Sequence, residues 1–134
     1  MERLEHIGIA VKNMEEANKL FAKLLGTEHY KTEEVGAEGV RTSFFKIGEV
    51  KIELLEATNE DSPISKFIEK RGEGIHHLAF EVNDIQQEIE ACKAKDFTVL
   101  GSPRPGADNK IICFLHPKST NGVLIELCQS VDDK

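Results

Sequence analysis

Two histidines and two glutamates recur at matched positions in the two halves of this chain. Glu53 follows His6 by 47 residues, and Glu126 follows His77 by 49 residues. The offset between the halves is 71 residues for the histidines and 73 for the glutamates, and the flanking sequences are alike. Imidazole nitrogens and carboxylate oxygens are common ligands of divalent transition metals. A duplicated unit that brings its two copies together would therefore form a metal site from these four residues.

Strand alternation favours a site over an ordinary packed core. Glu126 is the one carboxylate in residues 123–129, a predicted strand whose two faces are otherwise largely apolar. Burying an unpaired carboxylate is costly, so we expect a cation beside Glu126 or a shifted pKa. His6 and His77 have glycine or alanine neighbours on their own faces, which leave space in front of each imidazole. Glu53 is the weaker case, because a glutamate on a half-exposed strand is ordinary.

The matched pairing decides against a simpler interpretation, in which the histidines are satisfied core residues and the glutamates are solvated. That interpretation is the better one for any of the four taken alone, but it does not explain the same residue types at the same points of both halves. It does suit the other histidines. His76 is expected to point away from the face of His77, His116 begins a turn where it orients a loop or touches a substrate, and His29 lies in a polar stretch.

The bulk properties indicate one cytoplasmic domain over residues 1–134 and exclude several classes of protein. A net charge of −7 without a Lys/Arg cluster excludes a nucleic-acid-binding protein. No apolar run is long enough to cross a membrane, and charges interrupt the N-terminal stretch where a signal peptide would be apolar. Three cysteines without CxxC spacing fit reduced core residues better than a disulfide framework.

Local patterns predict the order strand, helix and then two or three strands in each half. Asn13 and Asp84 are placed to cap a helix, each followed by apolar residues at helical spacing. Strands are expected at residues 6–11, 40–47, 50–56, 77–82, 97–100, 111–115 and 123–129, with a loop at 101–110. The class is therefore α+β, with module 1–60 and module 73–134 joined by a short helix within residues 63–70.

Three segments carry a resemblance to a known family. The opening LEHIGIAVKN, the central GIHHLAFEV and the closing FLHPKSTNGVLIELCQ resemble methylmalonyl-CoA epimerases of the vicinal oxygen chelate (glyoxalase/bleomycin-resistance/dioxygenase) superfamily. The resemblance covers nearly the whole chain, and the HPK…GVLIEL run is its more specific part. It implies two βαβββ modules that form a curled mixed sheet around a divalent metal. Carried over by position, the metal ligands are His6, Glu53, His77 and Glu126.

The resemblance also implies a reaction. These enzymes interconvert (2R)- and (2S)-methylmalonyl-CoA by removing and returning an α-proton through a metal-stabilised enolate. The substrate carboxylate and thioester oxygen can chelate one ion, which stabilises the charge of the enolate. Glu126 is the first candidate for acid/base catalysis and Glu53, another group or a water is the second. The ligand set suits Co²⁺, Mn²⁺, Ni²⁺ or Zn²⁺. Relatives commonly pair as homodimers, so a homodimer is expected.

The chain departs from some relatives in ways that bear on the second acid/base. Certain members carry Gln at the position of Glu53, so a carboxylate there is not required by the family chemistry. Others carry an acidic residue near the position of Thr42, proposed as one of two bases, and threonine cannot serve that way. The loop PGADNK also lacks a histidine found in many relatives.

Other functions remain open from the sequence. A glyoxalase I-type lactoylglutathione lyase uses a similar His-Glu-His-Glu set, but no convincing glutathione clamp is visible near the start. An extradiol dioxygenase generally uses two histidines and one carboxylate, and a non-enzymatic binding protein of this fold often loses the ligands. Ethylmalonyl-CoA is an alternative substrate. Lys118 or Arg104 could contact the phosphates of coenzyme A, or could be plain solvated charges.

Overall fold

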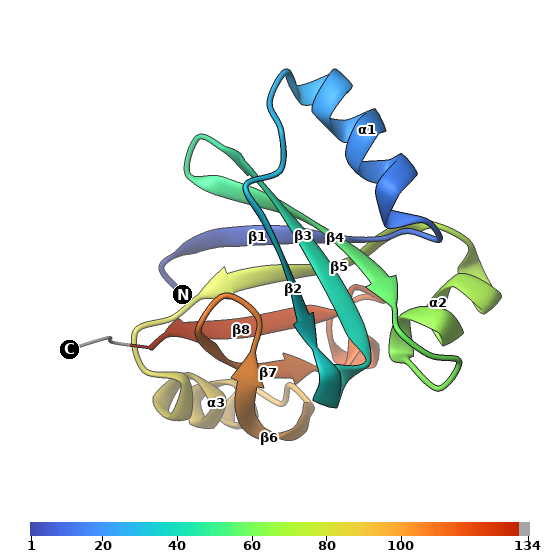
Figure 1. The fold of residues 1–134 in the computed structure, drawn as a ribbon. Helices are drawn as coiled ribbons and strands as arrows, with labels where there is room; N and C mark the ends of the chain where they lie inside the picture. The colour runs from blue at the N-terminus through green and yellow to red at the C-terminus, as the bar shows by residue number, and fades with distance from the viewer. Residues whose placement is uncertain (132–134) are drawn as a thin grey trace. The chain divides into compact units, whose positions relative to one another are not determined.

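The structure is a computed structural model that describes residues 1–131, and it divides into two compact units. The first unit is His6–His76, and the second unit consists of Met1–Glu5 together with the residues from His77 onward. Strand β1 (Arg3–Ala10) contributes to both, because its first residues belong to the second unit. Figure 1 shows the order of the elements along the chain. The predicted modules 1–60 and 73–134 stay a prediction.

The first unit builds its sheet in the order β2-β3-β4-β1. Strand β4 is parallel to β1 and antiparallel to β3, and β3 is antiparallel to β2. After β1 its elements are α1 (Met14–Leu25), β2 (Lys31–Val35), β3 (Val40–Ile47), β4 (Val50–Ala57) and α2 (Pro63–Arg71). Helix α1 packs on this sheet through a buried cluster that includes Met14, Phe45 and Leu54. The helix predicted within residues 63–70 is confirmed as α2.

The second unit repeats the plan in the order β5-β8-β7-β6. Its elements are β5 (Gly74–Glu81), α3 (Ile85–Ala94), β6 (Val99–Gly106), β7 (Lys110–Leu115) and β8 (Ile125–Ser130). Strand β8 is parallel to β5 and antiparallel to β7, as β4 is to β1 and β3 in the first unit. Helix α3 packs on the sheet through Ile85, Ile89 and Cys92. The Met1–Glu5 segment joins this unit through the amide of Glu2, which donates to the carbonyl of Glu81.

The two units share their capping contacts as well as their strand order. Asn13 and Asp84 each accept a hydrogen bond from the amide three residues on, so both predicted N-caps are confirmed. The first amide of each helix also donates to a side chain on the last strand of its own unit. Met14 N donates to Glu56 at 2.9 Å, and Ile85 N donates to Gln129 at 2.7 Å. Glu56 and Gln129 each lie three residues after the predicted metal-ligand glutamate, so the duplication extends to single contacts.

One sequence prediction about the strands is wrong, and one strand was missed. Residues 101–106 were expected in a loop, but they belong to β6, where the register shifts between Leu100 and Arg104. Prolines are tolerated there because β6 is an edge strand and its outer side needs no amide donors. Strand β2 was not predicted, since its sequence KTEEV is too polar to show an apolar alternation. Within the described residues 1–131, no helix is long and apolar enough to cross a membrane.

Candidate metal centre

The first unit places His6 beside Glu53. Strands β1 and β4 run parallel with Gly8 opposite Glu53, which leaves no side chain between the imidazole and the carboxylate. His6 Nδ1 lies 3.1 Å from Glu53 Oε2, and both residues are only 4% exposed. An ionisable pair at this depth requires favourable partners, because leaving a charged carboxylate unpaired in the core is costly.

The second unit places His77 beside Glu126 across an equivalent pair of parallel strands, but through the other ring nitrogen. Ala79 lies opposite Glu126 across the parallel pair β5 and β8, and His77 Nε2 lies 3.1 Å from Glu126 Oε1. The histidine is 5% exposed and the glutamate 6%. The sequence argument that β8 is buried on both faces holds, since Leu127 and Cys128 are fully buried in different clusters. Each unit therefore holds one of the two predicted His–Glu pairs.

A phenylalanine and a cationic side chain accompany each pair. Phe44 lies opposite Glu53 in the β3–β4 ladder, and Phe114 lies opposite Glu126 in the β7–β8 ladder. The Nζ of Lys31 lies 4.8 Å from the centroid of the Phe44 ring, and the guanidinium carbon of Arg104 lies 5.4 Å from that of Phe114. The ring of Phe114 also meets His77 edge-on, at 5.9 Å between centroids. Each His–Glu pair thus has an apolar wall with a positive charge above it.

The separation within each pair suits two ligands of a single ion. Two donor atoms held about 2.1 Å from one ion at a right angle lie about 3.0 Å apart. The observed nitrogen-to-oxygen distances are 3.1 Å in both pairs. Two imidazoles and two carboxylates are also a donor set of borderline hardness, which transition metals prefer over Ca²⁺ or Mg²⁺. The residues present therefore fit a divalent transition metal.

The remaining histidines have structural surroundings, as the sequence indicated. The ring of His76 meets Phe67 of α2 edge-on at 4.9 Å between centroids. His116 Nδ1 accepts from the amide of Lys118 at 2.9 Å, which orients the turn after β7. His29 packs on Phe45, at 5.9 Å between ring centroids.

The three cysteines are free and buried, as predicted. Burial raises the pKa of the Cys92, Cys113 and Cys128 thiols above their ordinary value of 9.0, and Glu88 and Glu126 raise those of Cys92 and Cys128 further. Raised values keep the thiols neutral and poorly nucleophilic at physiological pH. The cysteines therefore contribute packing rather than chemistry.

Comparison with known proteins places this arrangement in a family. The family model of the Glyoxalase/Bleomycin resistance protein/Dioxygenase superfamily matches residues 5–114. The chain belongs to this superfamily. A protein named ethylmalonyl-CoA/methylmalonyl-CoA epimerase from Cereibacter sphaeroides is 42% identical to it over 95% of this chain and 97% of its own length. Human mitochondrial methylmalonyl-CoA epimerase is 36% identical over 96% of this chain and 74% of its own length.

A solved structure shows the same fold. A variant of Streptomyces coelicolor methylmalonyl-CoA epimerase, in complex with 2-nitronate-propionyl-CoA, has a TM-score of 0.94 and 37% identity. The match covers 98% of this chain and 99% of that chain. The family resemblance found in the sequence is confirmed, and so is the α+β fold of two βαβββ modules.

Sequence reasoning missed the aromatic walls and the charges above them. Phe44 could have been found, because a two-residue turn at Gly48 and Glu49 fixes the register of the β3–β4 hairpin and puts Phe44 opposite Glu53. Phe114 could not, because the segment between β7 and β8 is longer and does not fix a register. Lys31 lies on β2, which was not predicted at all.

Proposed function

We propose that this protein is an epimerase that interconverts the (2R) and (2S) forms of methylmalonyl-CoA. The observation that carries the proposal is the buried His–Glu pair at the same point of each unit, in a chain that aligns almost end to end with methylmalonyl-CoA epimerases. The nitronate in the similar Streptomyces structure is a planar anion, as is the enolate formed when the α-proton leaves a thioester.

The two pairs are proposed to hold one divalent ion between them, with His6, Glu53, His77 and Glu126 as its ligands. The fit of the donor set and of the distances within each pair supports this assignment. The candidate ions are Co²⁺, Mn²⁺, Ni²⁺ and Zn²⁺, all of which accept imidazole and carboxylate ligands. When bound, such an ion supplies a Lewis acid that lowers the cost of negative charge on the thioester oxygen.

The residues of the chain have separate tasks in this proposal. Glu126 is the proposed acid/base for one face of the substrate, because its strand is the more apolar of the two and a carboxylate in such surroundings can be tuned to exchange protons near neutral pH. Glu53 is the candidate from the sequence for the other face. Phe44 and Phe114 exclude water from their side of each pair, which strengthens electrostatic interactions there. Arg104, above Phe114, is a candidate contact for an anionic part of coenzyme A.

A second substrate has support of its own. The Cereibacter relative is named for both ethylmalonyl-CoA and methylmalonyl-CoA. A pocket that admits one more methylene discriminates only weakly, by about 1–3 kcal/mol. Ethylmalonyl-CoA is therefore the second candidate, for the same site and the same reaction.

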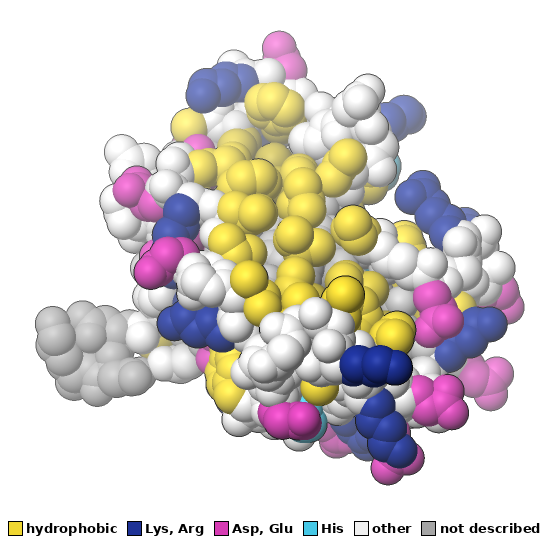
Figure 2. Space-filling view, turned by 90° about the horizontal axis from the view of Figure 1, so that it is seen from above, with side chains coloured by type: hydrophobic (Ala, Val, Ile, Leu, Met, Phe, Trp, Pro, Cys, Tyr) yellow, Lys and Arg dark blue, Asp and Glu magenta, His cyan; other side chains and the backbone are white. Residues whose placement is uncertain are grey.

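A homodimer is proposed, with its interface on the first unit. A groove of about 590 Å³ runs between α1 and β1 and is lined by Ile9, Val11, Leu20 and Phe21 among others. Leu20 is 61% exposed and Leu24 is 71% exposed, and a large apolar surface of this kind typically marks a contact site. Figure 2 shows hydrophobic side chains gathered in a band on one face. A second copy of the chain is the proposed occupant, and the cytoplasmic location stays a prediction.

The oligomeric state tests the interface. Leu20→Lys should convert a dimer into a monomer in sedimentation or light-scattering measurements, because a charge in an apolar contact must be desolvated. Gln86→Lys, at an exposed position of α3, is the control and should leave the dimer intact. A dimer that survives Leu20→Lys would contradict this interface.

The reaction is tested by giving the purified, metal-loaded protein one pure epimer and following the other by chiral separation. We expect equal amounts of the two epimers at equilibrium, and no conversion after chelation of the metal. Activity on the hemithioacetal of methylglyoxal and glutathione in place of methylmalonyl-CoA would instead establish a glyoxalase I-type lyase. Binding of the thioester without turnover would leave a binding protein of this fold.

A further inference from the structure

The wall of the His77–Glu126 pair includes a cation from the edge strand β6. We propose that Arg104 binds the free carboxylate of the malonyl thioester, and so selects an acyl group that carries an acid over one that does not. This proposal rests on the proposed epimerase function and deepens it. The residues that carry it all belong to the second unit.

An irregularity in β6 puts Arg104 on the face of the sheet that carries the pair. Arg104 lies opposite Ile112, which is two residues from Phe114. Residues opposite one another share a face, and so do residues two apart on one strand. A ladder that continued from Leu100 without the shift would have Ser102 in this place. The bulge therefore puts a guanidinium group where a hydroxyl would otherwise lie, and bulges beside active sites commonly redirect a side chain in this way.

The side chain of Arg104 lies close to the pair. Its guanidinium carbon is 5.4 Å from the centroid of the Phe114 ring, and that ring meets His77 edge-on at 5.9 Å between centroids. Phe114 also lies opposite Glu126. A Cβ added to Gly101, whose φ of 70° suits glycine, would lie 3.8 Å from Arg104 Nη1. The guanidinium group therefore lies between the bulge and the aromatic wall of the pair.

The charge of the pair favours a cation here when a malonyl group binds. Glu126 is only 6% exposed, and the cluster around Phe114 is apolar. A substrate carboxylate is repelled by a like charge, and removal of the α-proton adds further negative charge to the substrate. Arg104 is half-buried, so water screens its charge less than it would at an open surface. Its positive charge therefore offsets this repulsion.

A guanidinium group suits this task by its shape. It is planar, its five N–H donors lie in that plane, and two of them can bind both oxygens of one carboxylate. Contact of its face with an aromatic ring leaves these donors available, and the remaining donors allow it to keep other hydrogen bonds at the same time. A propionyl group lacks the carboxylate and gains nothing from this contact.

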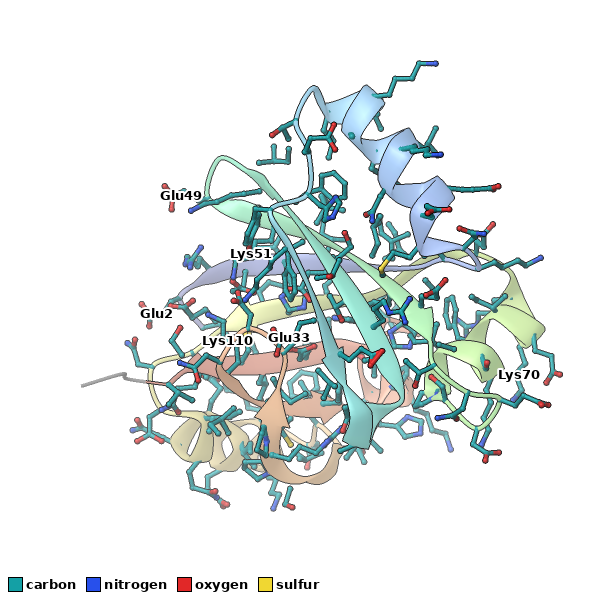
Figure 3. The ribbon with its side chains drawn as sticks, in the orientation of Figure 1. Glu2, Glu33, Glu49, Lys51, Lys70 and Lys110 are labelled. Atoms are coloured by element: carbon teal, nitrogen blue, oxygen red, sulfur yellow. The ribbon has the colours of Figure 1, made fainter. Side chains whose placement is uncertain are left out.

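A second cation on the same face has a different task. Lys110, at the start of β7 and labelled in Figure 3, donates to Ser130 Oγ at 2.9 Å. Its Nζ also lies 3.8 Å from Oε2 of Glu5, a residue that is only 1% exposed. Lys110 thus provides the counter-charge of a buried carboxylate of the chain itself, whereas Arg104 lies on the wall of the pair.

The phosphates of coenzyme A are a different set of anions, and the place of Arg104 argues against them. The free carboxylate of a malonyl thioester is bonded to the carbon that loses the proton, so it must lie at the pair during the reaction. The pantetheine arm contains two amide groups, and when extended it holds the phosphates well away from that carbon. A cation on the wall of the pair is therefore better placed for the carboxylate.

The experiment compares two ligands that differ by the carboxylate, methylmalonyl-CoA and propionyl-CoA. Calorimetry on metal-loaded protein gives the Kd of each. Arg104→Gln should weaken binding of methylmalonyl-CoA by about 10–100-fold, the effect of losing a charge-assisted hydrogen bond, and should leave propionyl-CoA within about 2-fold of the parent. Arg104→Lys should recover part of the affinity, because a point charge lacks the planar fork.

Two controls locate the contact. Lys93→Gln removes the same charge from an exposed position of α3, which packs on the opposite face of the sheet, and should behave as the parent. Methylmalonyl-pantetheine keeps the carboxylate and lacks the phosphates of coenzyme A. Arg104→Gln should weaken its binding by the same factor as that of methylmalonyl-CoA.

Two results would overturn the role of Arg104. Equal affinity of Arg104→Gln and Lys93→Gln for methylmalonyl-CoA would show that Arg104 does not bind the carboxylate. A loss for both CoA thioesters that disappears with methylmalonyl-pantetheine would assign Arg104 to the phosphates. If thermal unfolding shows that Arg104→Gln is not folded, Arg104→Lys decides by the same comparison, and parental affinity in that variant would overturn the role.

Failure of the epimerase function itself has a separate signature. A parent protein that binds methylmalonyl-CoA without interconverting its epimers would refute the reaction, while the two Kd values would still report whether Arg104 recognises the carboxylate. A parent protein that binds neither thioester would refute the proposed function and the role of Arg104 together.

Discussion

The two glutamates of the proposed centre differ in their surroundings although they occupy equivalent places. Glu126 is flanked on its own face by Cys128, a fully buried thiol, and lies opposite Phe114. Glu53 is flanked by Lys51 and lies opposite Phe44. Each phenylalanine has one cation above it, Lys31 or Arg104, so Lys51 is the positive charge that distinguishes the surroundings of Glu53. An apolar neighbourhood raises the proton affinity of a carboxylate, whereas positive charges lower it. The environment of Glu126 therefore suits proton transfer, and that of Glu53 suits a permanent anion that binds a cation.

This difference predicts unequal effects of the same substitution. Glu126→Gln should lower kcat by about 10²–10⁴-fold, because an amide cannot carry the proton. Glu53→Gln should retain a measurable rate, because an amide oxygen can still bind a metal ion. Steady-state kinetics with metal content measured on the same samples checks both. Equal losses in the two variants would contradict separate roles.

The sequence was sufficient to predict the two His–Glu pairs and not to predict their neighbours. His6, Glu53, His77 and Glu126 could be singled out because duplication repeats residue types at matched spacing, a signal that requires no structure. Phe114 offered no such signal, since the segment between β7 and β8 does not fix the register of these strands. Its place opposite Glu126 depends on strand pairing, which only the folded chain supplies.

At the scale of elements, the edge strand β6 shows how the second unit departs from the first. It carries two prolines and a register shift, while β2 in the first unit is short and regular. The sequence predicted a loop here because proline and glycine normally interrupt strands. Pairing with β7 on one side holds residues 101–106 in a strand despite their prolines and glycines. Local composition does not contain this pairing, so it could not predict the strand.

Gly106, at the end of β6, is predicted to be necessary for stability because the packing around it leaves no room for a side chain. A Cβ atom at this position would lie 2.8 Å from Ile112 Cγ2, and Ile112 is 6% exposed in a cluster with Ala79 and Cys128. Gly106→Ala should therefore lower the free energy of unfolding by about 1–3 kcal/mol through overpacking. Gly36→Ala is the control, because nothing lies within 4 Å of its added Cβ. Urea denaturation of both variants measures the difference, and equal stabilities would contradict the packing argument.

At the scale of the whole molecule, the buried thiols make stability depend on pH. Their pKa values are raised in the folded state above the ordinary value of 9.0, so the unfolded chain loses these protons first as pH rises. Their contribution to stability is complete below about pH 9 and is lost above it. The free energy of unfolding should fall between pH 9 and 11, and Cys128→Ala should reduce that slope. Identical slopes for the parent and Cys128→Ala would exclude a contribution from this thiol.

At the scale of the whole chain, the proposed metal centre implies that neither half has a complete ligand set. Each unit supplies one histidine and one glutamate, and two protein ligands hold a divalent ion weakly compared with four. The matching caps, helix-start contacts and strand orders show that the two halves are built on the same plan. The proposed four-ligand centre would account for this repetition.

Titration of metal-free protein with Co²⁺ by calorimetry tests this claim most directly. We predict one ion per chain, with tight binding lost in both His6→Ala and His77→Ala, because each removes a ligand of the same ion. Binding of two ions per chain, or tight binding that survives either substitution, would contradict a centre shared by the two units.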